Sequence, residues 1–475
     1  MTGSLIYLTV EPTLTDMEEV VLQKLKEKII ERMDIPPTVL KDKKLMEKYL
    51  MNQIDMEFKK HKLKVVKEAK EKLIYYLKRS FLGYGKIDLL MLDPNIEDIS
   101  CNGVNTVLYV WHRKYESIPT NILYETNKEL NSIIRRLAYK AGHQISVAYP
   151  ILEGTLPEGY RVHLTLDEVS KRGDTFTIRK FRADPYTIID LIDLGTLSPQ
   201  IAAYLWLLVE NLRSIMISGA AASGKTSLLN ATCMFIQPEM KLVSIEEVRE
   251  LRLHENWIPM VTRPSFQPGV QEITLYELLR SALRQRPDYI IVGEIRGEEA
   301  YTLFQSIAVG HGGLCTIHAD NVDSAIKRLV TRPMNIPEMM IPLMSIMVQI
   351  RRMKVGENVA RRIDKIVEVK DVAKDGEVRL EPRFLWNAGM DSFEYVPPPS
   401  GGDNLFQRIS EINHIPVEKL KEELIRRETI LRWMAEKGIN SYNEVADVVR
   451  AYHVNPDEVY EKLRGDYQDE DSSGS

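Results

Sequence analysis

Apolar residues recur at helical spacing near the start of the chain. Two groups share this spacing: Leu22, Leu25, Ile29 and Ile30, and Val66, Leu73, Ile74 and Leu77. Side chains three and four positions apart lie on one face of a helix. We therefore expect residues 1–84 to form an N-terminal helical region, with its helices between residues 16 and 80.

The pattern becomes mixed between residues 85 and 183. Short strand-like runs occupy residues 107–111 and 176–179, and a helical pattern covers residues 129–141. Gly154, Pro157 and Gly159 mark turns between them. This mixture predicts a smaller α+β domain over residues 85–183.

Buried-type strands and helical patterns alternate in the next part of the chain. Four strand-like apolar runs cover residues 214–218, 242–245, 289–292 and 313–317. Such alternation favours an α/β fold with a mainly parallel sheet, which we place in a domain over residues 184–396. A linker at 397–404, a helical region at 405–465 and a disordered acidic tail at 466–475 complete the prediction.

Composition argues against several classes of protein, among them nucleic-acid-binding, disulfide-rich and membrane-spanning proteins. The 475 residues carry a net charge of −5, which gives no reason to expect nucleic-acid binding. The cysteines Cys101, Cys233 and Cys315 are far apart, which argues against a disulfide framework or a zinc site and fits a reducing compartment. We see no signal peptide, and the longest apolar stretch, 339–350, is too short to span a bilayer. The lysine-rich stretch 59–72 is either a solvated helix face or a docking surface for a partner or an acidic membrane.

A phosphate-binding loop follows the first strand of the α/β domain. The motif GxxxxGK[ST] is matched in full by Gly219, Ala220, Ala221, Ala222, Ser223, Gly224, Lys225 and Thr226, and Ser227 follows it. An apolar strand precedes the motif and a helical pattern follows it, so backbone N–H groups and a helix N-terminus face the same anion. Lys225 is expected to reach the β- and γ-phosphates of a nucleotide, and the Thr226 hydroxyl to ligate Mg²⁺. The nearest match to a guanine-reading NKxD motif, residues 127–130, lacks the Asp, so ATP is favoured over GTP.

Carboxylates end two later strands. Glu294 follows the apolar run 290–293, where it would hold Mg²⁺ through water. Glu246 and Glu247 follow the run 242–245, and strands of such sheets carry functional groups at their carboxyl ends. Glu246 is our choice for the group that polarises the attacking water. The alternative is a solvated carboxylate pair after a core strand.

Two histidines flank the last strand-like run. His311 and His318 are seven positions apart, which is a weak metal-site signal without a third ligand. A structural role is the plain alternative for each. His318 follows a strand of the same predicted sheet, so we also consider that it contacts the γ-phosphate and reports hydrolysis.

Taken in order, these motifs resemble the secretion ATPase superfamily, the motors of type II secretion, type IV pili and the archaellum. That pattern is a P-loop, an acidic box at 245–247, the Walker B sequence 292–297 and a histidine box at 310–319. The stretch 283–288 looks like the archaeal branch, and the resemblance covers residues 85–465. Glu247 departs from the Asp usual in the acidic box, and the paired-cysteine zinc element of bacterial type II motors is absent.

The resemblance implies more than the residues alone. It implies a PAS-like N-terminal domain that supplies Arg161 and Arg179 to the nucleotide; taken singly, each arginine would otherwise be a surface ion pair. It implies a RecA-like ATPase domain, a homo-hexameric ring, and a polytopic membrane platform protein at the inner face of the cytoplasmic membrane, with accessory motor proteins as further partners. The alternatives are a DNA-translocating or conjugation ATPase of the same superfamily and an ATP-gated scaffold with little turnover.

Overall fold

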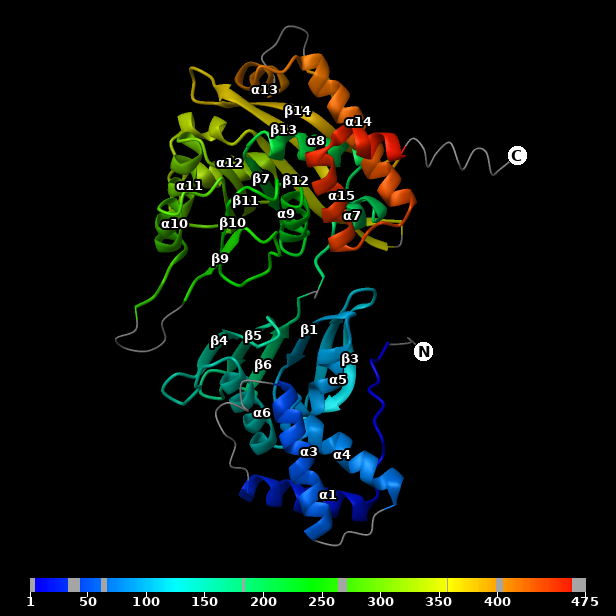
Figure 1. The fold of residues 1–475 in the computed structure, drawn as a ribbon. Helices are drawn as coiled ribbons and strands as arrows, with labels where there is room; N and C mark the ends of the chain where they lie inside the picture. The colour runs from blue at the N-terminus through cyan, green and yellow to red at the C-terminus, as the bar shows by residue number, and fades with distance from the viewer. Residues whose placement is uncertain are drawn as a thin grey trace, which may run out of the picture. The chain divides into compact units, whose positions relative to one another are not determined.

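The protein folds as two units. The structure is a computed structural model that describes residues 5–32, 43–60, 66–181, 184–263, 271–356, 358–398 and 405–463. The units are Met1–Arg182 and Ala183–Ser475, coloured blue to teal and green to red in Figure 1. Parts of the predicted linker (399–404) and the whole predicted tail (466–475) lie outside the described residues.

Three helices begin the first unit: α1 (Asp16–Arg32), α3 (Lys43–Lys60) and α4 (Lys67–Phe81). Leu25 and Ile29 of α1 and Leu73 of α4 are buried in a core that the helices share. Two residues of the apolar pattern lie outside this core, since Ile30 is 63% exposed and Val66 is 71% exposed. Ile30 is one position past the buried face, and Val66 is the residue that precedes the first turn of α4.

The rest of the first unit is a six-stranded antiparallel sheet with helices against it. After η1 (Gly85–Ile87) and α5 (Asp88–Leu92), the strands lie in the order β3-β2-β1-β6-β5-β4. Their bounds are β1 Ile96–Cys101, β2 Val107–His112, β3 Glu116–Leu123, β4 Ile151–Thr155, β5 Arg161–Thr165 and β6 Thr175–Arg179. Helix α6 (Asn127–Lys140) starts at Thr126, whose side chain accepts the N–H of Glu129, and it packs Leu130 and Ile134 into the core of this sheet.

A nine-stranded sheet forms the centre of the second unit. Its order is β15-β14-β13-β12-β7-β11-β10-β8-β9, and the six strands from β12 to β9 are parallel. The parallel strands are β7 Ile215–Gly219, β8 Leu242–Glu246, β9 Trp257–Val261, β10 Tyr289–Ile295, β11 Gly312–His318 and β12 Ile346–Val355. Strands β13 (Asn358–Val372), β14 (Val378–Asn387) and β15 (Ser392–Tyr395) extend the sheet beyond β12, each antiparallel to the strand before it.

Helices cover both faces of this sheet (Figure 1). The helices on one face are α7 Ile188–Asp193, α8 Pro199–Glu210, α9 Lys225–Cys233, α13 Leu405–Asn413, α14 Val417–Glu436 and α15 Tyr442–Val454. Those on the other are α10 Leu275–Leu283, α11 Glu299–Ala308, α12 Val322–Val330 and η2 Glu338–Leu343. Along β7 the side chains alternate accordingly: Ile215 and Ile217 face the first core and Met216 faces the second.

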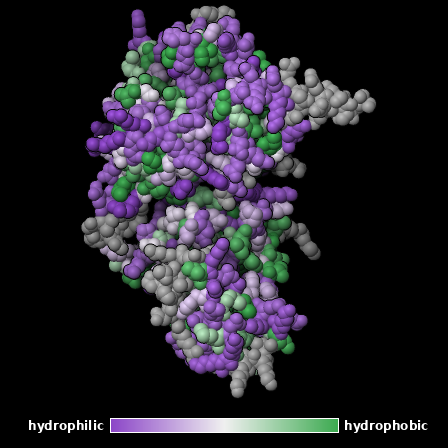
Figure 2. Space-filling view, viewed as in Figure 1, coloured by the Kyte–Doolittle hydropathy of each residue, from purple (hydrophilic) through white to green (hydrophobic). Residues whose placement is uncertain are grey.

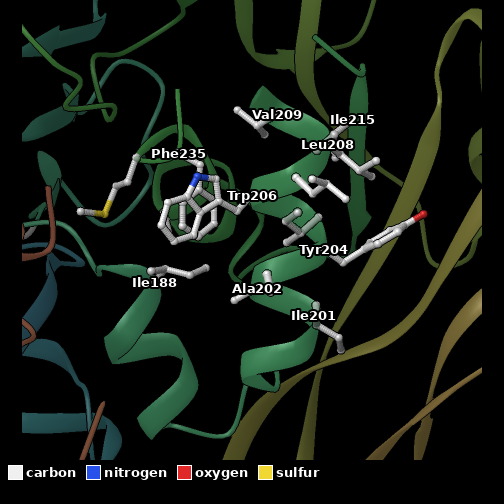
Figure 3. Close-up of a cluster of buried hydrophobic side chains, with 14 of the residues drawn as sticks. Ile188, Ile201, Ala202, Tyr204, Trp206, Leu208, Val209, Ile215 and Phe235 are labelled. Atoms are coloured by element: carbon white, nitrogen blue, oxygen red, sulfur yellow. The ribbon is translucent and has the colours of Figure 1, made fainter. Parts of the chain in front are cut away.

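Helix α8 is buried on all sides. It starts with Ser198 as its cap and Pro199 in its first turn, and every residue from Ile201 to Val209 is buried. Figure 3 shows Trp206 of α8 stacked on Phe235, with ring centroids 5.0 Å apart. Trp206 also contacts Tyr452 of α15, with ring centroids 5.2 Å apart, so the C-terminal helices share the core of the sheet domain.

The described residues contain no helix that is long and apolar enough to cross a membrane. Figure 2 shows hydrophilic residues over most of the visible face of each unit, with hydrophobic residues scattered among them. The predicted fold class is confirmed: an α/β, RecA-like domain preceded by a smaller α+β domain, with helices added at both ends.

Candidate active site

The phosphate-binding loop connects β7 to α9. Gly219 is the last residue of β7 and Lys225 is the first of α9. Two residues in the turn have left-handed backbone angles: Ala222 with φ 57° and Gly224, the helix cap, with φ 96°. The Lys225 ammonium donates to the carbonyl oxygens of Gly219 and Ala220, both at 3.0 Å. The loop is therefore closed on itself, with its lysine folded back over it.

The geometry of the loop fits a bound phosphate. A Cβ on Gly219 would lie 2.4 Å from the Ser223 hydroxyl oxygen and 2.5 Å from the Ile350 carbonyl oxygen, so only glycine fits there. The Ser223 hydroxyl is buried and has no hydrogen-bond partner among the described residues. A buried hydroxyl without a partner is costly, and an anion at the N-terminus of α9 would supply the partner. Thr226 and Ser227, in the first turn of α9, are half-buried.

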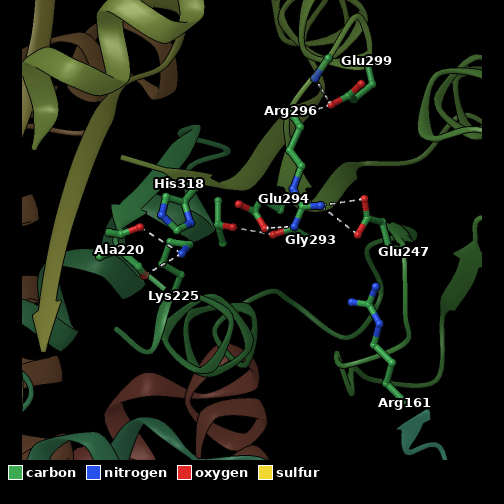
Figure 4. Close-up of polar contacts among 12 residues, drawn as sticks. Arg161, Ala220, Lys225, Glu247, Gly293, Glu294, Arg296, Glu299 and His318 are labelled. Carbon is green, nitrogen blue, oxygen red and sulfur yellow. Dashed lines mark hydrogen bonds and ion pairs between the residues drawn. The ribbon is translucent and has the colours of Figure 1, made fainter. Parts of the chain in front are cut away.

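A charged network lies at the end of β10, next to this loop (Figure 4). Glu294 binds Arg296 with 2.7 Å between Oε2 and Nη2, and the other Arg296 nitrogen binds Glu247 at 3.0 Å. Burial lowers the pKa of Lys225, while the negative charge of Glu294 raises it and the positive charge of Arg296 lowers it. Glu294 is therefore close enough to act electrostatically on Lys225.

Glu246 ends the neighbouring strand β8 and is buried. One oxygen, Oε1, accepts the backbone N–H groups of Glu250 and Leu251 at 2.9 and 3.0 Å. The other, Oε2, is buried without a hydrogen-bond partner among the described residues. Burial raises the pKa of Glu246 to about 7, although the two N–H groups oppose the shift. A carboxyl group with a pKa near neutrality and one unpaired oxygen suits a general base.

Gly293 explains how Glu246 fits beside β10. A Cβ on Gly293 would lie 3.2 Å from Cγ of Glu246, so a side chain there would press on the carboxylate's stem. The Gly293 carbonyl oxygen accepts the Thr316 hydroxyl of β11 at 2.7 Å. The ends of the adjacent strands β8, β10 and β11 therefore pack closely around Glu246.

The two histidines lie at opposite ends of β11 and so do not form a pair. His318 ends the strand in register with Gly219 of β7, and Figure 4 shows it at the same end of the sheet as Lys225. His311 precedes the strand, and its Nδ1 lies 2.7 Å from the carbonyl oxygen of Pro287. Among the described residues no cluster of three or more His, Cys, Asp or Glu could hold a metal ion.

Arg161 and Arg179 are neighbours in the first unit. They lie directly opposite each other on β5 and β6. Arg161 pairs with Glu153 at 2.9 Å and Arg179 with Asp98 at 3.0 Å. The structure thus places the two arginines together, while their action on a nucleotide stays a prediction.

One residue beside the loop was missed in the sequence. Arg361 of β13 donates its Nε–H to the carbonyl oxygen of Ala222 at 3.2 Å, and its stem lies over Gly224. β13 is antiparallel to β12, which is the neighbour of β7. Only the pairing of these strands brings Arg361 to the loop, so the local sequence gave no signal for it.

Fold and site together define a P-loop protein whose acidic groups come from the strands beside the loop. Residues 88–374 match the model of the family described as Type II/IV secretion system protein. The chain belongs to this family, whose members include the secretion ATPases that its motifs resemble.

Three similar proteins illustrate the family. The uncharacterized protein MJ0900 of Methanocaldococcus jannaschii is 36% identical over 404 residues, which are 83% of this chain and 72% of that protein. The type IV secretion system protein PtlH of Bordetella pertussis is 32% identical over 45% of this chain and 70% of its own length. The crystal structure of the VirB11 ATPase from the Brucella suis type IV secretion system is 26% identical, with a TM-score of 0.30, over 58% of this chain and 90% of that one.

Proposed function

We propose that this protein is a motor ATPase that hydrolyses ATP to power assembly of a type IV pilus-like filament: an archaellum, a pilus or a type II/IV secretion system. The observation that carries the proposal is the arrangement around the P-loop. Lys225 begins α9 at the end of β7, and Glu246 and Glu294 lie at the ends of strands of the same sheet. Membership of the secretion family supports the coupling to a filament or secretion machine.

The residues of the loop would bind and orient ATP. The Lys225 ammonium would leave the Gly219 and Ala220 carbonyls and pair with the β- and γ-phosphates, and the backbone N–H groups of residues 220–227 would face the phosphate oxygens. The Thr226 hydroxyl and, through water, Glu294 would hold Mg²⁺. When bound, Mg²⁺ neutralises charge on the phosphates.

Three further groups would act on the reaction. Glu246, with Oε2 unpaired, would accept the proton of the attacking water. His318, at the end of β11, would contact the γ-phosphate and respond to its loss. Arg161 and Arg179 would neutralise charge on the transferring phosphoryl group, which requires that the first unit and an ATP-bound second unit come together.

The larger assembly in this proposal is a ring. Six copies would form it at the inner face of the cytoplasmic membrane, where it would push on a polytopic platform protein with accessory motor proteins as further partners. The N-terminal helical region would provide a docking surface specific to the system. Loss of γ-phosphate contacts would release the closed form of each subunit.

Phosphate release by the full chain tests the proposal. Lys225→Ala should abolish turnover, and Glu294→Gln should keep nucleotide binding while stopping hydrolysis. Lys419→Ala and Glu422→Gln, on the exposed face of α14, are the matched controls and should turn over ATP like the natural sequence. Turnover near the natural rate in Lys225→Ala would refute the P-loop assignment. Light scattering with a non-hydrolysable ATP analogue tests the ring, and stimulation of turnover by DNA would favour a DNA-translocating ATPase instead.

A further inference from the structure

A cavity lies at the opposite end of the sheet from the P-loop. Its volume is about 470 Å³, and its lining residues come from four segments: Glu210–Ser214; Ile307, Gly310 and His311; Pro342, Leu343 and Ser345; and Leu405, Arg408, Ile412 and Asn413. The first three segments precede β7, β11 and β12 and the fourth belongs to α13, whereas the P-loop follows the other end of β7. Figure 1 shows α13 far from α9 within the second unit. The proposed ATPase reaction uses none of these residues.

Two arginines make the cavity positively charged. The Nε of Arg213 is buried and has no hydrogen-bond partner among the described residues. The pKa of Arg213 is lowered first by burial and further by the charge of Arg408 on α13, while Tyr289 opposes the shift. Arg408 itself donates to the Lys370 carbonyl oxygen at 3.4 Å. Burial and the charge of Arg408 both disfavour the charged form of Arg213, and an anion beside the two arginines would stabilise it.

The carboxylate in the cavity wall is already engaged. Glu210 binds Arg427 through Oε2, and its Oε1 lies 3.3 Å from Nδ1 of His453. Burial alone would raise the pKa of Glu210, but hydrogen bonds and charge from His453 and Arg427 lower it to about 2. Glu210 is therefore a partner of the C-terminal helices, and the charge of Arg213 is left for a group from outside.

The rim of the cavity is apolar. Leu212 and Ile412 line it and are 39% and 60% exposed, and Val309, between two lining residues, is 75% exposed. Leu212 also has a φ of 53°, which is rare and strained for a branched side chain. Exposed apolar groups around half-buried arginines are typical of protein interfaces. A free inorganic anion would pair with the arginines but leave this rim in water.

We propose that the cavity docks an acidic peptide segment of a partner protein. Aspartate or glutamate side chains of the segment pair with the guanidinium groups of Arg213 and Arg408, and a neighbouring apolar side chain covers Leu212 and Ile412. Guanidinium groups bind carboxylates with two parallel hydrogen bonds, which gives the contact both strength and direction. The site is separate from the nucleotide site and does not depend on ATP hydrolysis.

Fluorescence anisotropy on the full chain tests this proposal. The probe is a labelled peptide of alternating leucine and glutamate, and its control has glutamine in place of every glutamate. The acidic peptide should bind at least tenfold more tightly, a difference of about 1.4 kcal/mol. Arg213→Gln and Arg408→Gln should each weaken its binding at least tenfold. Arg432→Gln, an exposed arginine of α14 that pairs with Glu428, is the matched control and should bind like the natural sequence.

Melting temperature and ATP turnover show whether each variant is folded, since neither arginine belongs to the proposed ATPase site. If Arg213→Gln does not fold, peptide binding by Arg408→Gln tests the proposal instead. Equal binding of the two peptides, or unchanged binding in a folded arginine variant, would refute the proposal. Equal binding of a peptide with glycine in place of leucine, together with displacement by inorganic phosphate, would assign a small-anion site instead. Self-association of the chain that is lost in Arg213→Gln would make the cavity an interface between copies, which also refutes it.

Discussion

Replacing Glu246 by Gln should make the protein more stable at alkaline pH and inactive at every pH. The substitution keeps the Oε1 acceptor that binds the N–H groups of Glu250 and Leu251. It replaces Oε2, which has no partner among the described residues, by an amide group. Gln therefore preserves the shape and the two hydrogen bonds but cannot ionise.

The size of the effect follows from the pKa of Glu246. Burial raises it from 4.5 in the unfolded chain to about 7 in the folded protein. As pH rises, Glu246 in the folded state keeps its proton after the unfolded state has lost it. The contribution of Glu246 to the free energy of unfolding is therefore highest below pH 4.5, falls between pH 4.5 and 7, and is constant above that range. From pH 5 to pH 8 the ionisation of Glu246 lowers the free energy of unfolding by about 2.5 kcal/mol, and the Gln variant does not show this decrease.

Urea denaturation at pH 5 and pH 8 measures this difference. Trp111 is in the first unit and the other four tryptophans are in the second, so a Trp111→Phe background makes tryptophan fluorescence report on the second unit alone. The stability of Glu246→Gln relative to its parent should rise by about 2.5 kcal/mol from pH 5 to pH 8. A relative stability that does not change with pH would show that Glu246 titrates normally, and would remove the physical reason for choosing it as the base. In the parent, turnover should increase with pH through about 7, because the carboxylate form accepts the proton.

Three further predictions concern the loop, the C-terminal helices and the arginine pair. Gly224→Ala, at φ 96° against the stem of a neighbouring arginine, should weaken ADP binding by about tenfold in calorimetry, since Ala costs about 1–2 kcal/mol in this conformation. Arg427→Met leaves the partly buried carboxylate of Glu210 without its arginine partner and should destabilise the second unit by about 3–5 kcal/mol in urea at pH 7. The loss should shrink as pH falls from 4.5 towards 2, where this carboxylate becomes protonated. Arg161→Ala and Arg179→Ala should each lower kcat by at least about tenfold, with a much smaller change in nucleotide affinity. If a variant lost kcat and nucleotide affinity by the same factor, its arginine would have no specific role in the transition state.

The parallel part of the sheet could be predicted because its strands are buried on both faces. Each predicted run, such as 214–218 and 289–292, is mainly apolar and matches an observed strand to within a few residues. The P-loop motif could also be found in the sequence, because it consists of consecutive residues. Glu246 and Glu294 could be chosen as candidates because each follows the apolar run of its strand.

The antiparallel strands β13 to β15 carried no such signal, because charged residues occupy buried positions in them. Glu368 is 4% exposed and Arg383 is 2% exposed. They form an ion pair with two hydrogen bonds, and Tyr204 of α8 also donates to Glu368. A charge is buried only when it is paired, and the pairing becomes visible only in three dimensions.

Contacts between residues distant in sequence also explain why Arg361 and the docking site were not predicted. Arg361 and Ala222 are 139 positions apart and are brought together by strand pairing, so no local sequence pattern marks Arg361. Arg213 and Arg408 are likewise distant in sequence and meet only because α13 closes the end of the sheet. The two cases differ in what the arginine finds: Arg361 has a carbonyl partner, whereas the Arg213 Nε has none among the described residues. A buried donor costs about 1–3 kcal/mol when it is left unpaired, and it is this uncompensated cost that makes the cavity a site for an acidic ligand.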